Sequence, residues 1–342
     1  MKKTFLFLIV IILLLSSLSG CSLNYQYTFH SFNYFDTYTT VLGYATSKSE
    51  FDSICTKINV MLSEYHKLFD IYNSYEDVGI TNLHSINNKA TKEPITVDDR
   101  ITDLLNFAVK LYNITDGKVN IAMGSVLSIW HTHRSEGLND PENASLPDIA
   151  KLKEASLHTD INDIIIDGNS VFLADDKMSL DVGAVAKGYV AEKVAKALES
   201  EGITGYSINI GGNVRTIGER KVLYGQKEWS AGIENPFNSE KLICTLKIKD
   251  LSLVTSGNYQ RYYYVNDEKY HHIIDPQMLM PSKYHTSVSV LCKDSALADG
   301  LSTALFNMSY QDGLSLIEKL EGVEVMWVEN DGSILYSNGF KN

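Results

Sequence analysis

The feature that most constrains the fold of this chain is its pairs of β-strands joined by short turns, with helical segments between the pairs. Residues 164–166 and 171–173 are apolar and β-forming, and the turn sequence DGNS separates them, which predicts a hairpin. A second hairpin is predicted at residues 323–328 and 333–336 around an Asn-Asp-Gly turn. Strands grouped in this way do not show the strict strand–helix alternation of a doubly wound parallel sheet. The pattern therefore predicts an α+β fold.

Helical periodicity lies between these groups of strands. Apolar residues recur every three or four positions in several segments, which predicts helices there. These segments are residues 51–68, 98–113, 185–200, 294–307 and 312–320. Single strands are predicted at residues 35–44 and 206–210, and several more follow between residues 229 and 292. Residues 131–147 are polar and contain Gly and Pro, so we interpret them as a surface excursion.

The N-terminus resembles a secretory signal. Lys2 and Lys3 precede an apolar run at residues 5–15, and small residues follow it. The run is shorter than the ~20 residues that span a bilayer, and its position behind two lysines disfavours a buried core helix. The sequence LSGC at residues 18–21 resembles the lipobox of bacterial lipoproteins, which implies that Cys21 carries lipid.

These features predict three parts of the chain. Residues 1–20 form a lipoprotein signal peptide, residues 21–30 form a lipidated tether, and residues 31–342 form the globular domain. The mature protein is then a membrane-anchored lipoprotein outside the cytoplasm, either on the outer face of the cytoplasmic membrane or in a periplasm. Several acyl chains anchor a protein stably, because each buried CH₂ contributes about 0.8 kcal/mol.

Charge and cysteine content exclude two classes of function. The net charge is −12 and no basic patch stands out, so nucleic acid is not an expected partner. Besides Cys21, the chain has Cys55, Cys244 and Cys292, which are far apart and form no zinc-binding pattern. We interpret them as thiols without a chemical role, and a single disulfide between two of them stays open.

Residues 180–189 (LDVGAVAKGY) form the segment richest in chemical features. An acidic residue at a strand end is followed by small residues and then by a helix that carries Lys187. Small residues let a ligand approach the backbone, and a helix N-terminus with a lysine favours a phosphate group. An ordinary tight turn with a solvated lysine is the alternative.

Two further segments carry candidate polar groups. Asp299 and Thr303 are four residues apart, so they share one helical face and offer two hard oxygen ligands to Mg²⁺. The alternative is a helix-capping aspartate beside a threonine that faces its own helix. In the segment HHIIDP at residues 271–276, a histidine is suited to act as a general base near neutral pH, although a lone histidine is more often structural.

The order of these motifs resembles that of the ApbE family, flavin transferases that move FMN from FAD onto proteins. The resemblance covers the chain from about residue 31 onward. The motifs that carry it, in order, are FDTYTTV, FDIYNSYEDVGITNLHSIN, TDGKVNIAMGSVLSIW, LDVGAVAKGY, INIGGN, WSAGIENP, VTSGNYQRYY, HHIIDP and ADGLSTALF. The resemblance implies a two-lobed α+β fold with mixed or antiparallel sheets, flanking helices and an FAD cleft between the lobes.

The resemblance also assigns roles to individual residues. Mg²⁺ ligands fall on Asp299, Thr303 and the carbonyl of Ala184, and the general base falls on His272. The implied FAD contacts are Phe35, Tyr72, Val119, Asn120, Asp181, Lys187 and Ile273.

The implied activity is Mg²⁺-dependent transfer of FMN from FAD to a Thr or Ser hydroxyl, with release of AMP. FAD is then the substrate, and the partners are acceptor flavoproteins of extracytoplasmic or membrane electron-transfer systems. Two alternatives stay open at this point. Water could replace the acceptor hydroxyl, which gives FAD hydrolysis to FMN and AMP, or the protein could be a lipoprotein that binds flavin without catalysis.

Overall fold

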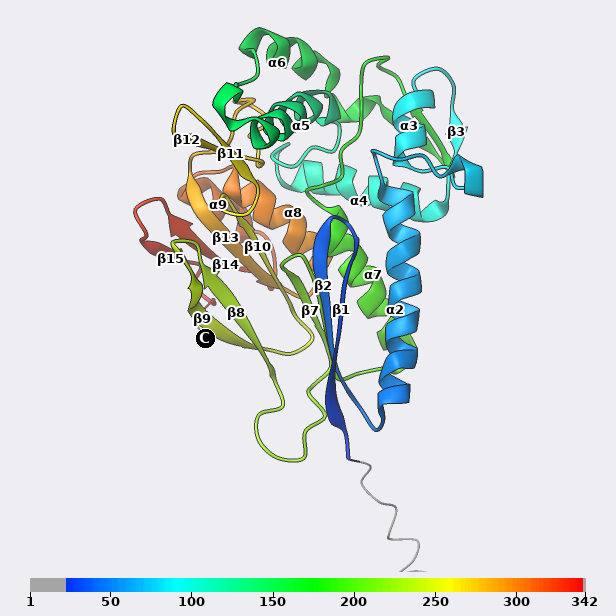
Figure 1. The fold of residues 1–342 in the computed structure, drawn as a ribbon, viewed down its shortest axis with the longest axis vertical. Helices are drawn as coiled ribbons and strands as arrows, with labels where there is room; N and C mark the ends of the chain where they lie inside the picture. Colours follow the sequence, from blue (N-terminus) through cyan, green and yellow to red (C-terminus); the bar gives the residue numbers. More distant parts are fainter. Residues whose placement is uncertain (1–22, 341–342) are drawn as a thin grey trace, which may run out of the picture.

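The structure is a computed structural model that describes residues 23–340. Its main element is an eight-stranded sheet in the order β1-β2-β6-β7-β10-β13-β14-β15, and every neighbouring pair is antiparallel (Figure 1). Its strands are β1 (Tyr25–Tyr34), β2 (Thr37–Ala45), β6 (Tyr206–Ile210), β7 (Asn213–Ile217), β10 (Ser252–Gly257), β13 (His285–Cys292), β14 (Glu324–Glu329) and β15 (Ile334–Tyr336). The predicted α+β class is confirmed.

Helices cover one face of this sheet. They are α2 (Lys48–Phe69), α7 (Ala186–Ser200), α8 (Ser295–Phe306) and α9 (Tyr310–Ile317). The other face is covered by the ribbon of β8 (Trp229–Asn235) and β9 (Asn238–Ile248), which buries Trp229 and Ile233 in a second apolar cluster with Met326. The sheet is therefore buried on both sides, which explains why seven of the eight residues of β13 are buried.

A second layer lies above one end of the sheet (Figure 1). Its helices are α3 (Leu83–Lys89), α4 (Asp99–Ile114), α5 (Gly124–Asn139) and α6 (Ile149–Ala155). Its strands are β3 (Ile95–Thr96), β4 (Ile164–Asp167), β5 (Ser170–Leu173), β11 (Tyr262–Val265) and β12 (Glu268–His271), and its 3₁₀ turns are η1 (Glu76–Val78), η2 (Pro141–Asn143), η3 (Ser156–His158) and η4 (Ile161–Asp163). The main hydrophobic core is continuous from α4 in this layer to β13 in the sheet.

Two sequence predictions are wrong. Residues 25–30 were expected in the tether, but they pair with residues 40–45 as the first part of β1. This strand forms because Tyr27 and Phe29 alternate with exposed residues and pack against the main core. Residues 131–139 were expected in a surface excursion, but they belong to α5, whose Trp130 and Gly137 are buried.

The predictions on the signal peptide and the cysteines concern residues both outside and within the described range. The signal peptide (1–20) and Cys21 lie outside them. Cys55 and Cys292 are buried thiols, and Cys244 is half-buried. Within residues 23–340, no helix has the length and apolar character that crossing a membrane requires.

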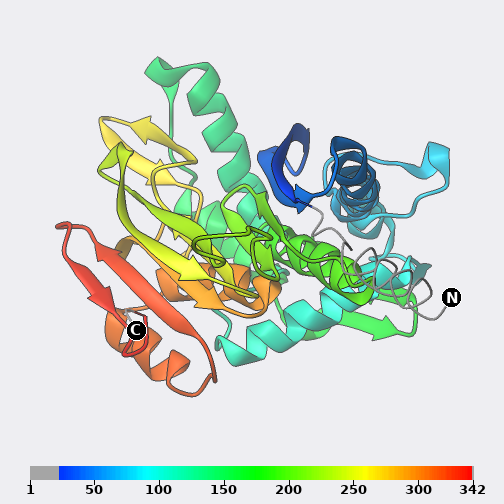
Figure 2. The same ribbon diagram turned by 90° about the horizontal axis from the view of Figure 1, so that it is seen from below.

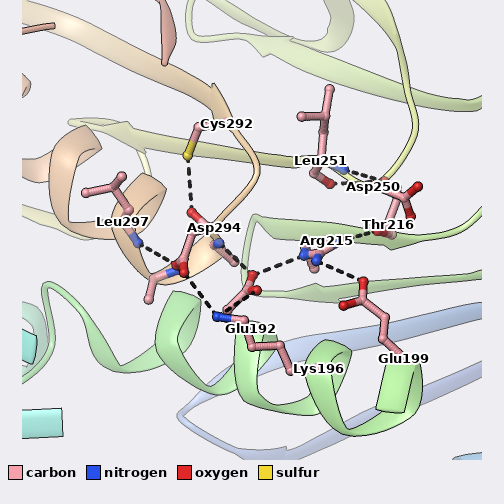
Figure 3. A network of polar contacts seen from close by, with 12 residues as sticks. Glu192, Lys196, Glu199, Arg215, Thr216, Asp250, Leu251, Cys292, Asp294 and Leu297 are labelled. Atoms are coloured by element: carbon pink, nitrogen blue, oxygen red, sulfur yellow. Dashed lines mark hydrogen bonds and ion pairs between the residues drawn. The ribbon is translucent and has the colours of Figure 1, made fainter. Parts of the chain in front are cut away.

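An ionic network around the buried side chains of Glu192 and Arg215 holds α7 against the start of α8 (Figure 3). Glu192 Oε2 accepts hydrogen bonds from Arg215 Nε at 3.0 Å and from the backbone N–H of Ser295 at 2.9 Å. Lys196 Nζ lies 3.3 Å from both Glu192 Oε1 and Asp294 Oδ2. Because these contacts tie α7 to the first turn of α8, they also determine which residues of the two helices face each other further along.

Candidate functional site

A cavity of about 400 Å³ lies where the second layer meets the end of the sheet. It is lined by the β1–β2 turn, the end of α2, the start of α7, one face of α5, the residues after β12 and the middle of α8. All the predicted metal, FAD and base positions line it: Phe35, Tyr72, Val119, Asn120, Asp181, Ala184, Lys187, His272, Ile273, Asp299 and Thr303. Segments more than 200 residues apart in sequence thus meet at one place.

One wall of the cavity carries the buried carboxylate of Asp299. It lies in the middle of α8, and the helix is capped by Asp294, so the alternative that Asp299 is the capping residue is wrong. Asp299 Oδ2 accepts a hydrogen bond of 2.8 Å from the backbone N–H of Gly188. Burial raises the pKa of Asp299. Among residues 23–340, no cationic side chain forms an ion pair with it, although the positive charge of Lys187 acts against this rise in its pKa. A cation bound beside the carboxylate would stabilise its charged form.

Glycine at position 188 lets the two helices approach closely enough for this hydrogen bond. A Cβ atom there would lie 2.3 Å from the backbone oxygen of Ser295 and 2.4 Å from Cβ of Asp299. Any side chain at this position would therefore push α7 away from α8. The small residue in the sequence AKGY thus has a packing role that was not assigned from the sequence.

The same wall holds the start of α7. Asp181 Oδ1 accepts a hydrogen bond of 2.8 Å from the Gly183 N–H, which shapes the turn before the helix. Lys187 Nζ donates to the Gly183 carbonyl at 3.3 Å. The first turn of the helix and the ammonium group therefore lie together on the cavity wall, and both favour an anionic ligand.

The two neighbouring histidines have different roles. Both ring nitrogens of His271 are used internally, because Nε2 lies 2.8 Å from the Ser282 carbonyl and Nδ1 accepts from the Ile273 N–H at 3.2 Å. Within the part of the chain that the structure describes, His272 uses only Nδ1, which lies 3.2 Å from the Arg261 carbonyl. A carbonyl can only accept, so Nδ1 carries the proton and Nε2 keeps a lone pair.

The surroundings of His272 keep its ring neutral. Burial, together with the positive charges of Arg261 and Arg134, lowers the pKa of His272 to about 3. A neutral ring with an unprotonated Nε2 is the form that a general base requires. His272 therefore has the protonation state and the position of a base, whereas His271 is structural.

The α5 wall was missed by the sequence analysis. Met123, at its N-terminal end, and Leu127, His131 and Arg134 follow one face of α5 and line the cavity. His131 Nδ1 lies 3.1 Å from the Tyr72 hydroxyl, and its Nε2 lies 3.8 Å from Asp181 Oδ2. Burial lowers the pKa of His131. The helical spacing of these four residues is the signal that could have revealed this wall.

Other features fit a ligand site. Asn120 is fixed at the cavity wall by internal hydrogen bonds, because Nδ2 donates to the Thr159 carbonyl at 2.8 Å, Oδ1 accepts from the Ala122 N–H at 2.9 Å and the backbone carbonyl accepts from the Met123 N–H at 3.3 Å. Two cavity-lining side chains, Asn213 and Asn307, each have a buried Oδ1 atom without a hydrogen-bond partner among the described residues. Unsatisfied buried oxygens are costly, so they point to a ligand or ordered water.

No group of three or more His, Cys, Asp or Glu side chains in residues 23–340 is arranged around a metal position. A donor set of one carboxylate, one hydroxyl and one backbone carbonyl contains a single member of those types. Mg²⁺ characteristically uses few protein groups and completes its coordination with phosphate and water. The residues around Asp299 therefore fit Mg²⁺ better than zinc.

Comparison with known proteins places the chain in context. The model of the ApbE family matches residues 35–327. A FAD:protein FMN transferase from Klebsiella pneumoniae is 31% identical over 285 residues, which cover 80% of this chain and 84% of the relative. One from Treponema pallidum is 30% identical over 273 residues, which cover 75% of this chain and 73% of the relative.

Solved structures agree with the fold. The crystal structure of the ApbE protein from Thermotoga maritima superposes with a TM-score of 0.80 at 25% identity, over 93% of this chain and 98% of that one. The flavin transferase ApbE from Vibrio cholerae gives a TM-score of 0.76 at 24% identity, over 93% of this chain and 99% of that one.

Proposed function

Because this chain belongs to the ApbE family, we propose that it transfers FMN from FAD to a Thr or Ser hydroxyl of an exported or membrane redox protein. The observation that carries the proposal is the position of a neutral His272, with Nε2 unprotonated, in the same cavity as the anion-binding wall of Lys187 and α7. A base and an anion site in one cavity are what an attack by a hydroxyl on a diphosphate requires.

The reaction follows from these positions. Lys187 and the first turn of α7 hold the diphosphate of FAD and stabilise the negative charge that develops on it. His272 Nε2 takes the proton of the acceptor hydroxyl. The hydroxyl oxygen then attacks the phosphorus of the FMN half, a new P–O bond forms, and the P–O bond to AMP breaks. AMP leaves with its phosphate, and FMN stays on the acceptor as a phosphoester.

Asp299, Thr303 and the Ala184 carbonyl are the residues that would hold Mg²⁺. Their fit rests on the oxygen-only donor set and on the buried Asp299 carboxylate, which has no cationic side chain paired with it among the described residues. Mg²⁺ bound there supplies positive charge to the diphosphate oxygens. Gly188 supports this role, because its N–H orients Asp299 Oδ2.

The decisive experiment mixes the protein with FAD, Mg²⁺ and solubilised membrane proteins and measures two products. We expect flavin fluorescence on a denatured gel band other than the enzyme, together with AMP release. AMP release without any labelled protein would favour FAD hydrolysis. Retained FAD with no AMP release would favour a flavin-binding protein without catalysis.

We also propose that Cys21 carries lipid and holds the protein at an extracytoplasmic membrane surface. The supporting observation is the signal-like sequence that ends in LSGC. Cells fed an alkyne-labelled fatty acid should label the wild-type protein and leave the Cys21→Ser variant unlabelled. Equal labelling of both would contradict the assignment.

A further inference from the structure

The loop between β7 and β8 projects from the end of the molecule where the described chain begins (Figures 1 and 2). It comprises residues 219–228 (ERKVLYGQKE). Leu223 and Tyr224 are 57% and 92% exposed, so two large side chains point into solvent at its tip. No charged residue lies between Leu223 and Gln226, whereas Arg220, Lys221 and Lys227 flank the tip and outnumber Glu219 and Glu228 at the two ends of the loop. An uncharged tip with cations at its base is the composition of an interfacial membrane element.

The base of the loop is held firmly against the body. The Arg220 N–H donates to the Lys227 carbonyl at 2.7 Å and closes the loop. The guanidinium of Arg220 donates to the Tyr44 hydroxyl at 3.0 and 2.8 Å. Just outside the loop, Trp229 Nε1 donates to the Gly218 carbonyl at 2.9 Å. These hydrogen bonds fix the base of the loop and hold its tip away from the core, so Leu223 and Tyr224 stay exposed.

The start of β1 adds apolar surface at the same end. Leu23 is 51% exposed and Tyr25 is 55% exposed. Cys21 precedes Tyr25 by only four residues, which span at most about 14 Å even when fully extended. A lipid on Cys21 would therefore hold this end, with its projecting loop, close to the bilayer.

We propose that the loop of residues 219–228 contacts the membrane and inserts Leu223 and Tyr224 into the interfacial region beside the lipid on Cys21. Tyr is well suited to this depth, because its ring is apolar and its hydroxyl stays hydrated. The net charge of −12 disfavours long-range attraction to anionic lipids. Insertion of apolar side chains, with local help from the flanking cations, is therefore the main contribution. This inference rests on the proposed lipid anchor.

If this end of the molecule contacts the membrane, the length of β1 determines how far the cavity lies from the bilayer surface. β1 has ten residues and runs from the anchored end to the turn at Phe35, which lines the cavity. At about 3.3 Å per residue, the strand spans about 30 Å. A membrane-bound acceptor would therefore have to present its hydroxyl well above the bilayer surface, on an extracytoplasmic domain rather than at the membrane boundary.

The test uses the full-length lipidated protein in phosphatidylcholine vesicles, with the substitution Tyr224→Trp as a fluorescent reporter. We expect the emission of the new indole to shift to shorter wavelength on vesicles and to be quenched by brominated lipids. The matched control is Phe237→Trp, because Phe237 is also exposed (58%) but lies past the far end of β8, beside the β14–β15 turn. The emission of the control reporter should stay water-like and unquenched.

Several outcomes would overturn the inference. One is a water-like, unquenched emission from the Tyr224→Trp variant in protein that floats with the vesicles, which would leave the lipid anchor and the transferase proposal intact. Others are equal quenching of the two reporters, or shielding of the Tyr224→Trp reporter only when an acceptor protein is added. Protein that does not float at all would contradict the anchor itself.

A second experiment uses the double variant Leu223→Ser/Tyr224→Ser in protein that lacks the lipid. The double substitution should weaken its retention on vesicles about tenfold, without changing AMP release in detergent.

Discussion

The two walls of the cavity differ in how they are encoded. On the α7–α8 wall, Lys187, Asp299 and Thr303 come from two short motifs: the four-residue spacing of Asp299 and Thr303 places them on one helical face, and Lys187 follows small residues at the start of α7. On the α5 wall, His131 and Arg134 come from a polar helix whose cavity face has no conspicuous motif. In the proposed function, the first wall would bind the anionic substrate and the metal, whereas the second adds the positive charge of Arg134 and a histidine whose pKa is lowered by burial. Candidate residues that lie close together in a motif can be predicted from the sequence. An electrostatic environment that separate helices and strands create cannot.

The largest effect should come from the α8 carboxylate. We expect Asp299→Asn to lower FMN transfer by roughly 1,000-fold, because a metal site contributes several kcal/mol to the transition state. Steady-state transfer assays with saturating FAD would measure this. The matched control is Asp294→Asn at the N-cap of the same helix, which keeps a capping side chain but removes the charge that pairs with Lys196, and it should cost less than about 1 kcal/mol of stability while leaving the rate nearly unchanged. Full activity of Asp299→Asn in Mg²⁺ would remove the metal role from this wall.

Variants of the two neighbouring histidines should differ by about 100-fold in the rate of FMN transfer. His272→Gln removes the base and should lower transfer by roughly that factor, whereas His271→Gln should mainly lower the melting temperature. The pH profile gives a second measurement. With its pKa lowered to about 3, His272 stays neutral as the pH falls from 7 to 5, so kcat/KM should show no limb near pH 6.5 from this group. Such a limb in wild type that disappears in His272→Gln would contradict the low pKa.

Substitution on the α5 wall should have a smaller effect, a fall of about tenfold in kcat/KM at low pH. Arg134→Gln removes a positive charge that lowers the pKa of His272, so that pKa should rise toward its usual value. The protonated fraction at low pH then grows, and transfer should fall earlier as the pH is lowered. Lys151→Gln, an exposed charge change on α6, controls for net charge. If the two profiles coincide, the α5 wall has no electrostatic role in catalysis.

The smallest effect concerns stability and packing. Gly188→Ala places a Cβ against backbone and Cβ atoms of α8 and should destabilise the protein by about 1–3 kcal/mol in urea unfolding. Gly137→Ala on α5, outside the cavity wall, meets the Tyr263 ring at 2.7 Å and the Ala144 side chain at 3.1 Å. Side chains can shift more easily than backbone, so its loss should be smaller. The reverse order would show that the α7–α8 contact is the softer one.

Most elements of the fold could be predicted because their patterns are local. The hairpin of β4 and β5 has a clear turn sequence between apolar runs. The helix α4 has a regular apolar stripe, and Asp98 caps its N-terminus. The second half of α5 was missed because residues 131–136 are all polar and resemble a loop, although His131 and Arg134 keep helical spacing with Met123 and Leu127. The first half of β1 was missed because the strand lies at the edge of the sheet and exposes most of its residues.

By itself, the sequence determined the α+β class and the family and named the candidate groups for chemistry, because these depend on residue type and short-range spacing. Only the tertiary structure decided which of two adjacent histidines has a free nitrogen, since that depends on the carbonyls of Arg261 and Ser282, which lie beyond each side of the motif. It also decided that Arg134 and Arg261 surround His272, because Coulomb interactions depend on distance in space and not on separation along the chain.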